Sequence, residues 1–230
     1  MQRISLPEPL DSLLNGLEAG SVTNIYGGPG TGKTNCCLMA ALDCFRRGGR
    51  SLFIDTEGGF SPERLRQLEP EKWRGLLDRI ELVQPKSFQE QGKVVRGLGK
   101  RDFNFIVVDS MVALYRIEYT EKGPGSKNLV LEANRELSKQ VSVLSNLARE
   151  RGIPVLITAH TFKNWDTGED EVIGGNTLRY WSKVILFLER TGRMSERKAT
   201  LVKHRHLPEG KQAKFELVEN GIKPAGFRIF

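Results

Sequence analysis

A run of eight residues near the start of the chain has the composition of a phosphate-binding loop. Residues 27–34 read GGPGTGKT and satisfy the pattern G-x-x-x-x-G-K-[S/T]. The glycines let backbone N–H groups converge on phosphate oxygens, the lysine reaches the β and γ phosphates, and the final threonine supplies a ligand to Mg²⁺. The stretch therefore predicts a site for ATP with Mg²⁺, made by Gly27, Gly28, Pro29, Gly30, Thr31, Gly32, Lys33, Thr34 and the following Asn35.

Acidic residues elsewhere are placed to complete the chemistry of such a site. A metal bound beside phosphates needs an acid on a neighbouring strand, and Asp109 ends the apolar stretch FIVVD, so Thr34 and Asp109 are the expected metal ligands. Hydrolysis also needs a group that orients or deprotonates water, and Glu57 is the better candidate. Asp55 is the alternative, because residues two apart in a strand point the same way, but Glu57 stands nearer the strand's carboxyl end.

A histidine, His160, follows a further apolar stretch, IPVLITA. Imidazole can donate a hydrogen bond to a phosphate oxygen, so His160 is a candidate catalytic-site residue that senses the γ-phosphate and signals its loss to the segment that follows. A structural histidine at a strand end is the alternative, and the sequence leaves both open.

The elements that must position these residues alternate between strands and helices. Short apolar stretches predict strands at 22–26, 51–57, 79–85, 104–110, 153–159 and 184–189. Helices are predicted after the phosphate loop, closing at Gly48 and Gly49, then from Pro62 with Ser61 as cap, and through the apolar periodicity of 130–148. This alternation predicts an α/β fold with a doubly wound, mostly parallel sheet. After residue 190 the stretches ATLVK, AKFELV and GFRIF predict an antiparallel appendage at one sheet edge.

Composition limits the classes of protein to which this chain can belong. The 230 residues fit a single sheet with a sizeable core, and no apolar run approaches the roughly 20 residues of a membrane span. The first residues do not resemble a signal peptide, so we expect a cytoplasmic protein with no membrane partner. Cys36, Cys37 and Cys44 lie on one predicted helix and are expected to be buried structural thiols.

Positive charge is concentrated at the end of the sequence. The formal net charge is +7, and residues 190–230 contain ten Lys and Arg against four Glu. A basic face favours polyanionic partners, although a solvated charged surface has the same composition. Within this region Lys203 and Arg205 would share one face of a strand.

The motifs together resemble the RecA/RadA recombinase family. LDSLLNGLEAGSVTNIYGGPGTGKT, FIDTEGGFSPERL, FIVVDS, VLITAH, IGGN and HLPEG occur in that family's order and spacing, over nearly the whole chain, and the chain is similar to the short archaeal paralogues of RadA. The resemblance implies one RecA-like ATPase core domain over residues 1–230, without the N-terminal helical DNA-binding domain of full-length RadA. It makes Glu57 the catalytic glutamate, Asp109 the metal-site aspartate and Arg64 a residue packed near the adenine base.

The resemblance also assigns DNA contacts. Residues 115–128 and 161–177, which fit neither helix nor strand, match the family's two DNA-facing loops, and each follows the carboxyl end of a strand, where open α/β sheets bind ligands. Cationic grooves and aromatic stacking hold single strands, which gives a use to Arg116, Lys122, Lys127, Lys163, Trp165 and Arg179. Glu118 and Glu121 weaken the first loop as a phosphate binder, and the family usually has Gln or Asn where this chain has His160.

Three roles stay open for Lys203 and Arg205. RadA-like sequences carry Asp and Pro there, whereas bacterial RecA has a K-x-K pair that reaches a neighbouring subunit's ATP. A cation supplied in trans offsets charge in phosphoryl transfer, so the pair is a candidate catalytic element of an assembly. Contact with DNA phosphates and a solvated edge are the alternatives.

These observations lead to an expected function and two alternatives. We expect an ATP-binding, DNA-binding accessory protein of homologous recombination and DNA repair, with weak or partner-dependent ATPase, acting on single-stranded DNA with the main recombinase RadA. Self-association is compatible with this expectation. The first alternative is a self-sufficient DNA-dependent ATPase that forms filaments and exchanges strands. The second is a clock-type or kinase-like protein of the same fold, without salt-dependent DNA binding.

Overall fold

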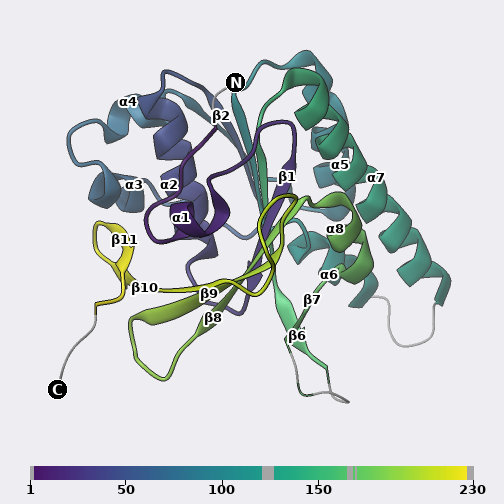
Figure 1. The fold of residues 1–230 in the computed structure, drawn as a ribbon. Coiled ribbons are helices and arrows are strands. Elements are labelled where there is room, and N and C mark those ends of the chain that lie inside the picture. The colour runs from purple at the N-terminus through teal and green to yellow at the C-terminus, as the bar shows by residue number, and fades with distance from the viewer. Residues whose placement is uncertain (1–2, 121–126, 165–167, 169, 227–230) are drawn as a thin grey trace.

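A twisted sheet lies between two layers of helices in the computed structural model (Figure 1). The structure describes residues 3–120, 127–164, 168 and 170–226. Over these residues the main sheet has nine strands in the order β11-β10-β9-β8-β1-β5-β4-β2-β3, and β6 pairs with β7 separately. The strands are β1 (Val22–Gly27), β2 (Ser51–Asp55), β3 (Ile80–Val83), β4 (Phe105–Asp109), β5 (Val155–Ala159), β6 (Thr161–Lys163), β7 (Asp170–Val172), β8 (Val184–Arg190), β9 (Glu196–Lys203), β10 (Gln212–Val218) and β11 (Gly221–Pro224).

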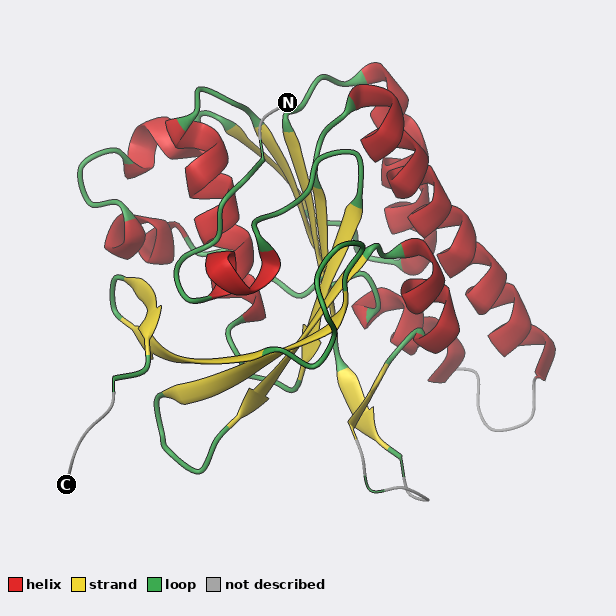
Figure 2. Cartoon of the chain, in the orientation of Figure 1, coloured by secondary structure: helices red, strands yellow, loops and turns green. Residues whose placement is uncertain are grey.

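The helices are divided between the two faces of the sheet. Figure 2 shows α1 to α4 on one side and α5 to α8 on the other. The helices are α1 (Leu10–Leu14), α2 (Lys33–Arg46), α3 (Pro62–Leu68), α4 (Trp73–Leu77), α5 (Phe88–Gly97), α6 (Ala113–Thr120), α7 (Lys127–Arg151) and α8 (Gly175–Trp181), with the short 3-10 helix η1 (Leu98–Lys100) after α5.

The central strands are parallel and buried on both faces. In β4 the side chains of Phe105 and Val107 pack into the core on the α1 to α4 side, whereas Ile106 and Val108 pack into the core on the other side. This alternation explains why the strand is continuously apolar in sequence. The predicted doubly wound sheet is confirmed, and the carboxyl ends of β1, β2, β4 and β5 meet at one edge.

The antiparallel edge is also confirmed. Strand β8 runs parallel to β1, and β9, β10 and β11 then pair antiparallel in succession. The strand predicted in GFRIF lies largely outside the described residues, and the last described strand is β11, which the sequence reading missed. Lys223 of β11 lies opposite Glu216 of β10, and four residues of pairing are too few to give a periodic sequence signal.

Two helix boundaries follow the predicted capping chemistry. The Ser61 side chain accepts a hydrogen bond from the Arg64 backbone N–H at 3.1 Å, and Pro62 opens α3. At the end of α2, the N–H groups of Gly48 and Gly49 donate to carbonyls of the last helical turn, and Gly48 has φ of 78°. Burial raises the pKa of the Cys36 thiol to about 12, as expected for a structural cysteine.

The two segments predicted to be irregular contain regular structure. The first includes most of α6 and the start of α7, and the second contains β6, β7 and the first turn of α8. Tyr115 of α6 packs edge-on against Phe88 of α5 with ring centroids 5.7 Å apart, which explains why polar residues around it still form a helix. Among the helices with described residues, each is too short or too polar to cross a membrane.

Candidate nucleotide-binding site

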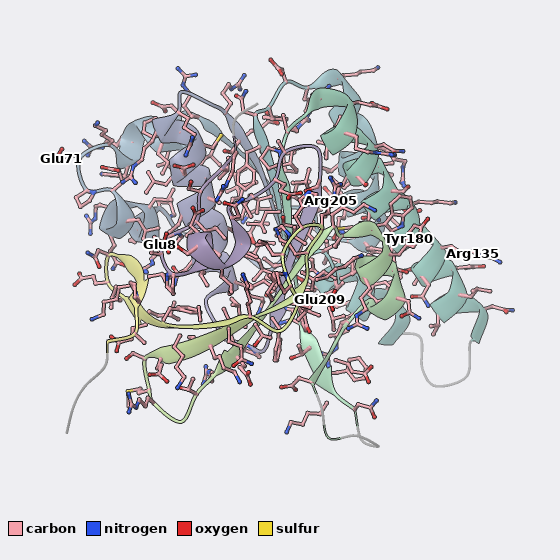
Figure 3. All side chains as sticks on the ribbon, viewed as in Figure 1. Glu8, Glu71, Arg135, Tyr180, Arg205 and Glu209 are labelled. Atoms are coloured by element: carbon pink, nitrogen blue, oxygen red, sulfur yellow. The ribbon has the colours of Figure 1, made fainter. Side chains whose placement is uncertain are left out.

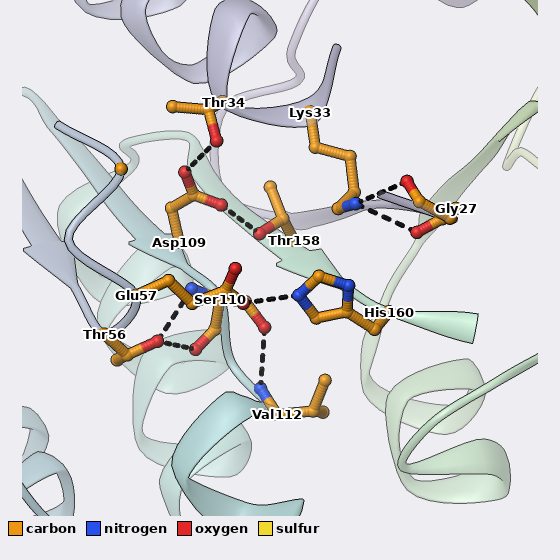
Figure 4. Close-up of polar contacts among 12 residues, drawn as sticks. Gly27, Lys33, Thr34, Thr56, Glu57, Asp109, Ser110, Val112, Thr158 and His160 are labelled. Carbon is orange, nitrogen blue, oxygen red and sulfur yellow. Dashed lines mark hydrogen bonds and ion pairs between the residues drawn. The ribbon is translucent and has the colours of Figure 1, made fainter. Parts of the chain in front are cut away.

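The glycine loop joins β1 to α2, as its sequence predicts, and its lysine folds back onto it. Lys33 Nζ donates to the carbonyl oxygens of Gly27 and Gly28 at 2.9 and 3.0 Å (Figure 4). Gly32 has φ of 101°, and a Cβ there would approach Leu217 of β10 to 2.9 Å, so glycine is required at this position. Burial lowers the pKa of Lys33, although the charges of Asp109 and Glu57 oppose this effect. Among the described residues Lys33 forms no ion pair with a carboxylate, so its ammonium group can turn from the carbonyl oxygens to an anionic ligand.

The predicted metal ligands are adjacent. Thr34 Oγ1 donates to Asp109 Oδ2 at 2.7 Å, and Thr158 of β5 donates to Asp109 Oδ1 at 2.5 Å (Figure 4). Burial raises the pKa of Asp109, and the two threonine hydrogen bonds only partly offset that effect. Mg²⁺ prefers oxygen ligands and is often held by one carboxylate, a hydroxyl and the phosphates of its nucleotide. The residues present fit that requirement.

Glu57 and His160 come from different strands and meet beside the loop. The Nε2 atom of His160, just after β5, lies 2.5 Å from Oε1 of Glu57, just after β2 (Figure 4). Burial raises the pKa of Glu57, but the hydrogen bond with His160 and the nearby charges outweigh burial, so this pKa is below its ordinary value. The lowered pKa keeps the Glu57 carboxylate ionised at neutral pH, and His160 is its hydrogen-bond partner.

Asp55 has a different position from Glu57. The strand ends at Asp55, so the expectation that the two side chains point the same way is wrong. The Asp55 carboxylate accepts hydrogen bonds from the backbone N–H groups of Glu57, Gly59 and Phe60 and from the Gln84 side chain. It holds the turn on which Glu57 sits and does not line the pocket.

A pair of residues that sequence reasoning missed, Thr56 and Ser110, connects the ends of β2 and β4. Thr56 Oγ1 donates to the Ser110 carbonyl oxygen at 2.8 Å and accepts from the Ser110 N–H at 2.9 Å. This contact fixes the spacing between Glu57 and Asp109, one residue away on each side. Thr158 was also missed, although a threonine inside the apolar stretch VLITA is a detectable sequence signal.

A pocket of about 440 Å³ contains most of the predicted nucleotide residues. Its lining includes Pro29, Gly30, Gly32, Lys33, Thr34, Asn35, Glu57, Arg64, Asp109 and His160. Arg64 Nη2 donates to the Val218 carbonyl oxygen at 2.9 Å and Nε donates to Asn35 Oδ1 at 2.8 Å. Arg64 therefore ties α3 to the turn after β10, with Leu217 beside it on the pocket wall.

The cations of KHRH do not share a strand face. Strand β9 ends at Lys203, so Arg205 lies on the following loop (Figure 3), and the expectation of a common face is wrong. Lys203 Nζ donates to the carbonyl oxygens of Arg179 and Ser182 at 2.6 and 2.9 Å, at the end of α8. Lys203 lies opposite Ile185, near the start of β8, whereas the glycine loop follows the end of the parallel strand β1. Both cations are therefore remote from the pocket of their own chain.

The predicted DNA-facing residues are partly described. Arg116 on α6, Lys163 on β6 and Arg179 on α8 are exposed. Lys122 and Trp165, and the side chain of Lys127, lie outside the described residues. A groove of about 750 Å³ separates α6 and α7 from the β6–β7 hairpin and the start of α8, and Arg116 and Phe162 are among its lining residues. The structure thus brings the two segments to opposite walls of one groove.

Comparison with known proteins agrees with these observations. The sequence model of the Rad51 family matches residues 5–225. The DNA repair and recombination protein RadB of Methanococcoides burtonii is 39% identical over 226 residues, covering 96% of this chain and 97% of that protein. RadB of Methanobrevibacter smithii is 36% identical over 223 residues, with 93% and 92% covered. A crystal structure of the RadB recombinase superimposes with a TM-score of 0.79 at 34% identity, covering 96% of this chain and 98% of that one. The RecA-like fold and the resemblance to RadA paralogues are confirmed.

Proposed function

The chain belongs to the Rad51 family, and from this premise we propose that it is an ATP-binding, DNA-binding accessory protein of recombination and DNA repair. Residues 1–230 act as one ATPase core domain in this proposal. Its partners are single-stranded DNA and the main recombinase of the same cell, RadA, and its location is the cytoplasm. The RadB relatives support the assignment to recombination and give no support to a clock-type or kinase-like role.

The proposal of nucleotide binding rests on four side chains that line one pocket. Lys33 and Thr34 of the glycine loop line the same cavity as Glu57 and Asp109, which come from two other parts of the sequence. When bound, Mg²⁺ would neutralise phosphate charge, and Thr34 and Asp109 would hold it. Lys33 would leave the carbonyls of its own loop to contact the phosphates.

The contact between Glu57 and His160 supports weak intrinsic turnover. A carboxylate that orients water must be within hydrogen-bond reach of that water, but here its Oε1 atom is 2.5 Å from an imidazole nitrogen. In the proposal, the γ-phosphate competes for His160, and a partner protein completes the release of Glu57. ATP then acts mainly as a conformational switch, because hydrolysis is slow until that release occurs.

Nucleotide-dependent DNA binding tests this function. The affinity of the purified chain for a fluorescent single strand is measured with Mg²⁺ alone, with ADP and with ATP. The proposal predicts tighter DNA binding with ATP and no nucleotide effect in Lys33→Ala. Equal DNA affinity under all three conditions would contradict the switch. Regular filaments with strand exchange by this chain alone would favour the self-sufficient recombinase instead.

A further inference from the structure

Two arginines from the antiparallel edge reach the back of the glycine loop. Arg190 ends β8, and Arg197 lies opposite it in β9. The Nε atom of Arg197 donates to the Gly30 carbonyl oxygen at 2.9 Å. Arg190 lies against the same residue, because a Cβ on Gly30 would be 2.3 Å from its guanidinium. Sequence reasoning counted both residues only as part of the basic C-terminal region.

Arg197 is buried, and its hydrogen bonds go to backbone carbonyls. Its Nη1 atom donates to the Met194 and Glu196 carbonyl oxygens, each at 2.9 Å. Its exposed fraction is 8%, and within the described part of the chain it forms no ion pair with a carboxylate. Burial lowers the pKa of Arg197, and the neighbouring charge of Arg190 lowers it further. A buried guanidinium without an anionic partner is costly unless an anion is bound nearby.

The geometry of the peptide group after Gly30 connects Arg197 to the direction of the next backbone N–H group. The peptide bond between Gly30 and Thr31 is trans, so its carbonyl oxygen and its N–H point in opposite directions. Arg197 is not among the residues that line the nucleotide pocket, and it holds the Gly30 carbonyl oxygen, so the Thr31 N–H points away from Arg197. No acceptor for this N–H is found among the described residues.

The other loop carbonyls are held in a similar way. The Thr31 hydroxyl donates to the Gly28 carbonyl oxygen at 2.9 Å, and Lys33 holds those of Gly27 and Gly28. Lys33 must leave these carbonyls when it contacts phosphate, whereas Arg197 lies outside the cradle and can keep its contact. Arg197 is therefore placed to restrain the loop without occupying the pocket.

From these contacts we infer that Arg197 is a positioning residue for nucleotide binding. It directs the Thr31 N–H toward the phosphates through the Gly30 carbonyl, and with Arg190 it places two positive charges behind the loop. This inference rests on the proposed nucleotide site. The same guanidinium also holds the Met194 carbonyl in the turn between β8 and β9, so this turn is connected to the glycine loop through Arg197.

Nucleotide affinity of the full-length chain tests the inference. Dissociation constants for ADP and ATP with Mg²⁺ are measured by calorimetry for the wild type, Arg197→Met and Arg197→Lys, after a melting curve has shown that each is folded. We expect about tenfold or greater loss for Arg197→Met with both nucleotides and a smaller loss for Arg197→Lys, since lysine keeps the charge but not the fork of donors. The control is Lys198→Met, which removes an ion pair with Glu189 on the opposite sheet face and should bind normally.

A spectroscopic signal separates positioning from general stability. In the wild type the Thr31 amide proton should shift downfield when ADP binds, and in Arg197→Met that shift should be reduced at saturating ADP. Wild-type affinity and an unchanged Thr31 shift in a folded Arg197→Met would overturn this inference and leave the proposed function standing. If Arg197→Met does not fold, wild-type affinity in Arg197→Lys would overturn it. A wild-type chain that binds no nucleotide would overturn the proposed function as well.

Discussion

At the scale of single residues, the contact between Glu57 and His160 joins the group proposed for hydrolysis to the group proposed for phosphate sensing. Each side chain stands just beyond the end of its strand, so a small movement of either segment changes their separation. The resemblance of the sequence leads us to expect an amide side chain at this position, where the chain has His160. An imidazole, like an amide, can donate a hydrogen bond, but its ring places the donor differently.

Replacing His160 tests this coupling. We predict that His160→Ala binds ATP with nearly unchanged affinity but loses the effect of ATP on DNA affinity, because the γ-phosphate then lacks its proposed partner just after β5. Fluorescence anisotropy with a labelled single strand, with and without ATP, measures the effect. His160→Gln serves as the conservative control and should retain part of it. An unchanged ATP effect in His160→Ala would remove the sensor role.

Asp109 gives a prediction about pH and stability. Burial raises its pKa in the folded chain, so its contribution to stability is complete below the unfolded pKa of about 4 and is lost as pH rises through the folded pKa. At neutral pH without Mg²⁺, Asp109→Asn should therefore melt several degrees above the wild type, and the difference should shrink toward pH 4. The same variant should lose Mg²⁺-dependent ATP binding. Equal melting temperatures at neutral pH would show that the ionised carboxylate carries no such cost.

At the scale of elements, Lys203 stabilises the end of α8 instead of forming a cationic strand face. We predict that Lys203→Met lowers the free energy of unfolding by about 1 kcal/mol, because two carbonyls at the helix end lose a charged donor. Arg205→Met is the matched control, since its pair with Glu18 is long, at 3.9 Å, and exposed, and its effect should be near zero. Urea unfolding measures both. If Lys203→Met is as stable as the wild type but loses ATP turnover, the role in trans is favoured over the cap.

The sequence predicts the elements better than it predicts the contacts between them. The glycine loop, the buried parallel strands and the Ser61 cap have local signals, because each depends on residues close together in the chain. The contacts of Arg197 with Gly30 and of Leu217 with Gly32 join residues that are far apart in the sequence. They depend on strand pairing, so no local sequence pattern predicts them. The error at Lys203 and Arg205 arose because the strand ends between them, and strand ends are poorly marked in sequence.

At the scale of the whole molecule, positive charge should govern DNA affinity. The net charge is +7, and Lys163 and Arg179 are exposed on elements that follow β5. We predict that the affinity for single-stranded DNA falls steeply with salt, and that Lys163→Ala and Arg179→Ala each reduce the slope of log affinity against log salt by about 1. Lys72→Ala, in the other helical layer, should leave the slope unchanged. A slope near zero in the wild type would contradict phosphate contact.

The proposed nucleotide site, the proposed DNA site and the antiparallel edge lie at one set of strand ends. The segment that carries Lys163 begins directly after His160, and the turn held by Arg197 is fixed to the glycine loop. If ATP and DNA bind as proposed, a change at the γ-phosphate has short covalent and hydrogen-bonded routes to both the groove beside Arg116 and the sheet edge. This arrangement suits an accessory protein whose bound nucleotide sets its affinity for other molecules.

Hydrolysis of ATP by the purified chain, with and without single-stranded DNA, shows whether His160 keeps Glu57 from activating water. Glu57→Ala is the blank, because it removes the proposed catalytic carboxylate without touching the phosphate loop, and ATP binding is confirmed in each sample. We predict that the chain alone binds ATP but hydrolyses it slowly, with or without DNA, because His160 holds the Glu57 carboxylate. Strong DNA-stimulated turnover that disappears in Glu57→Ala would contradict the claim of a nucleotide switch and would show a self-sufficient recombinase-type ATPase.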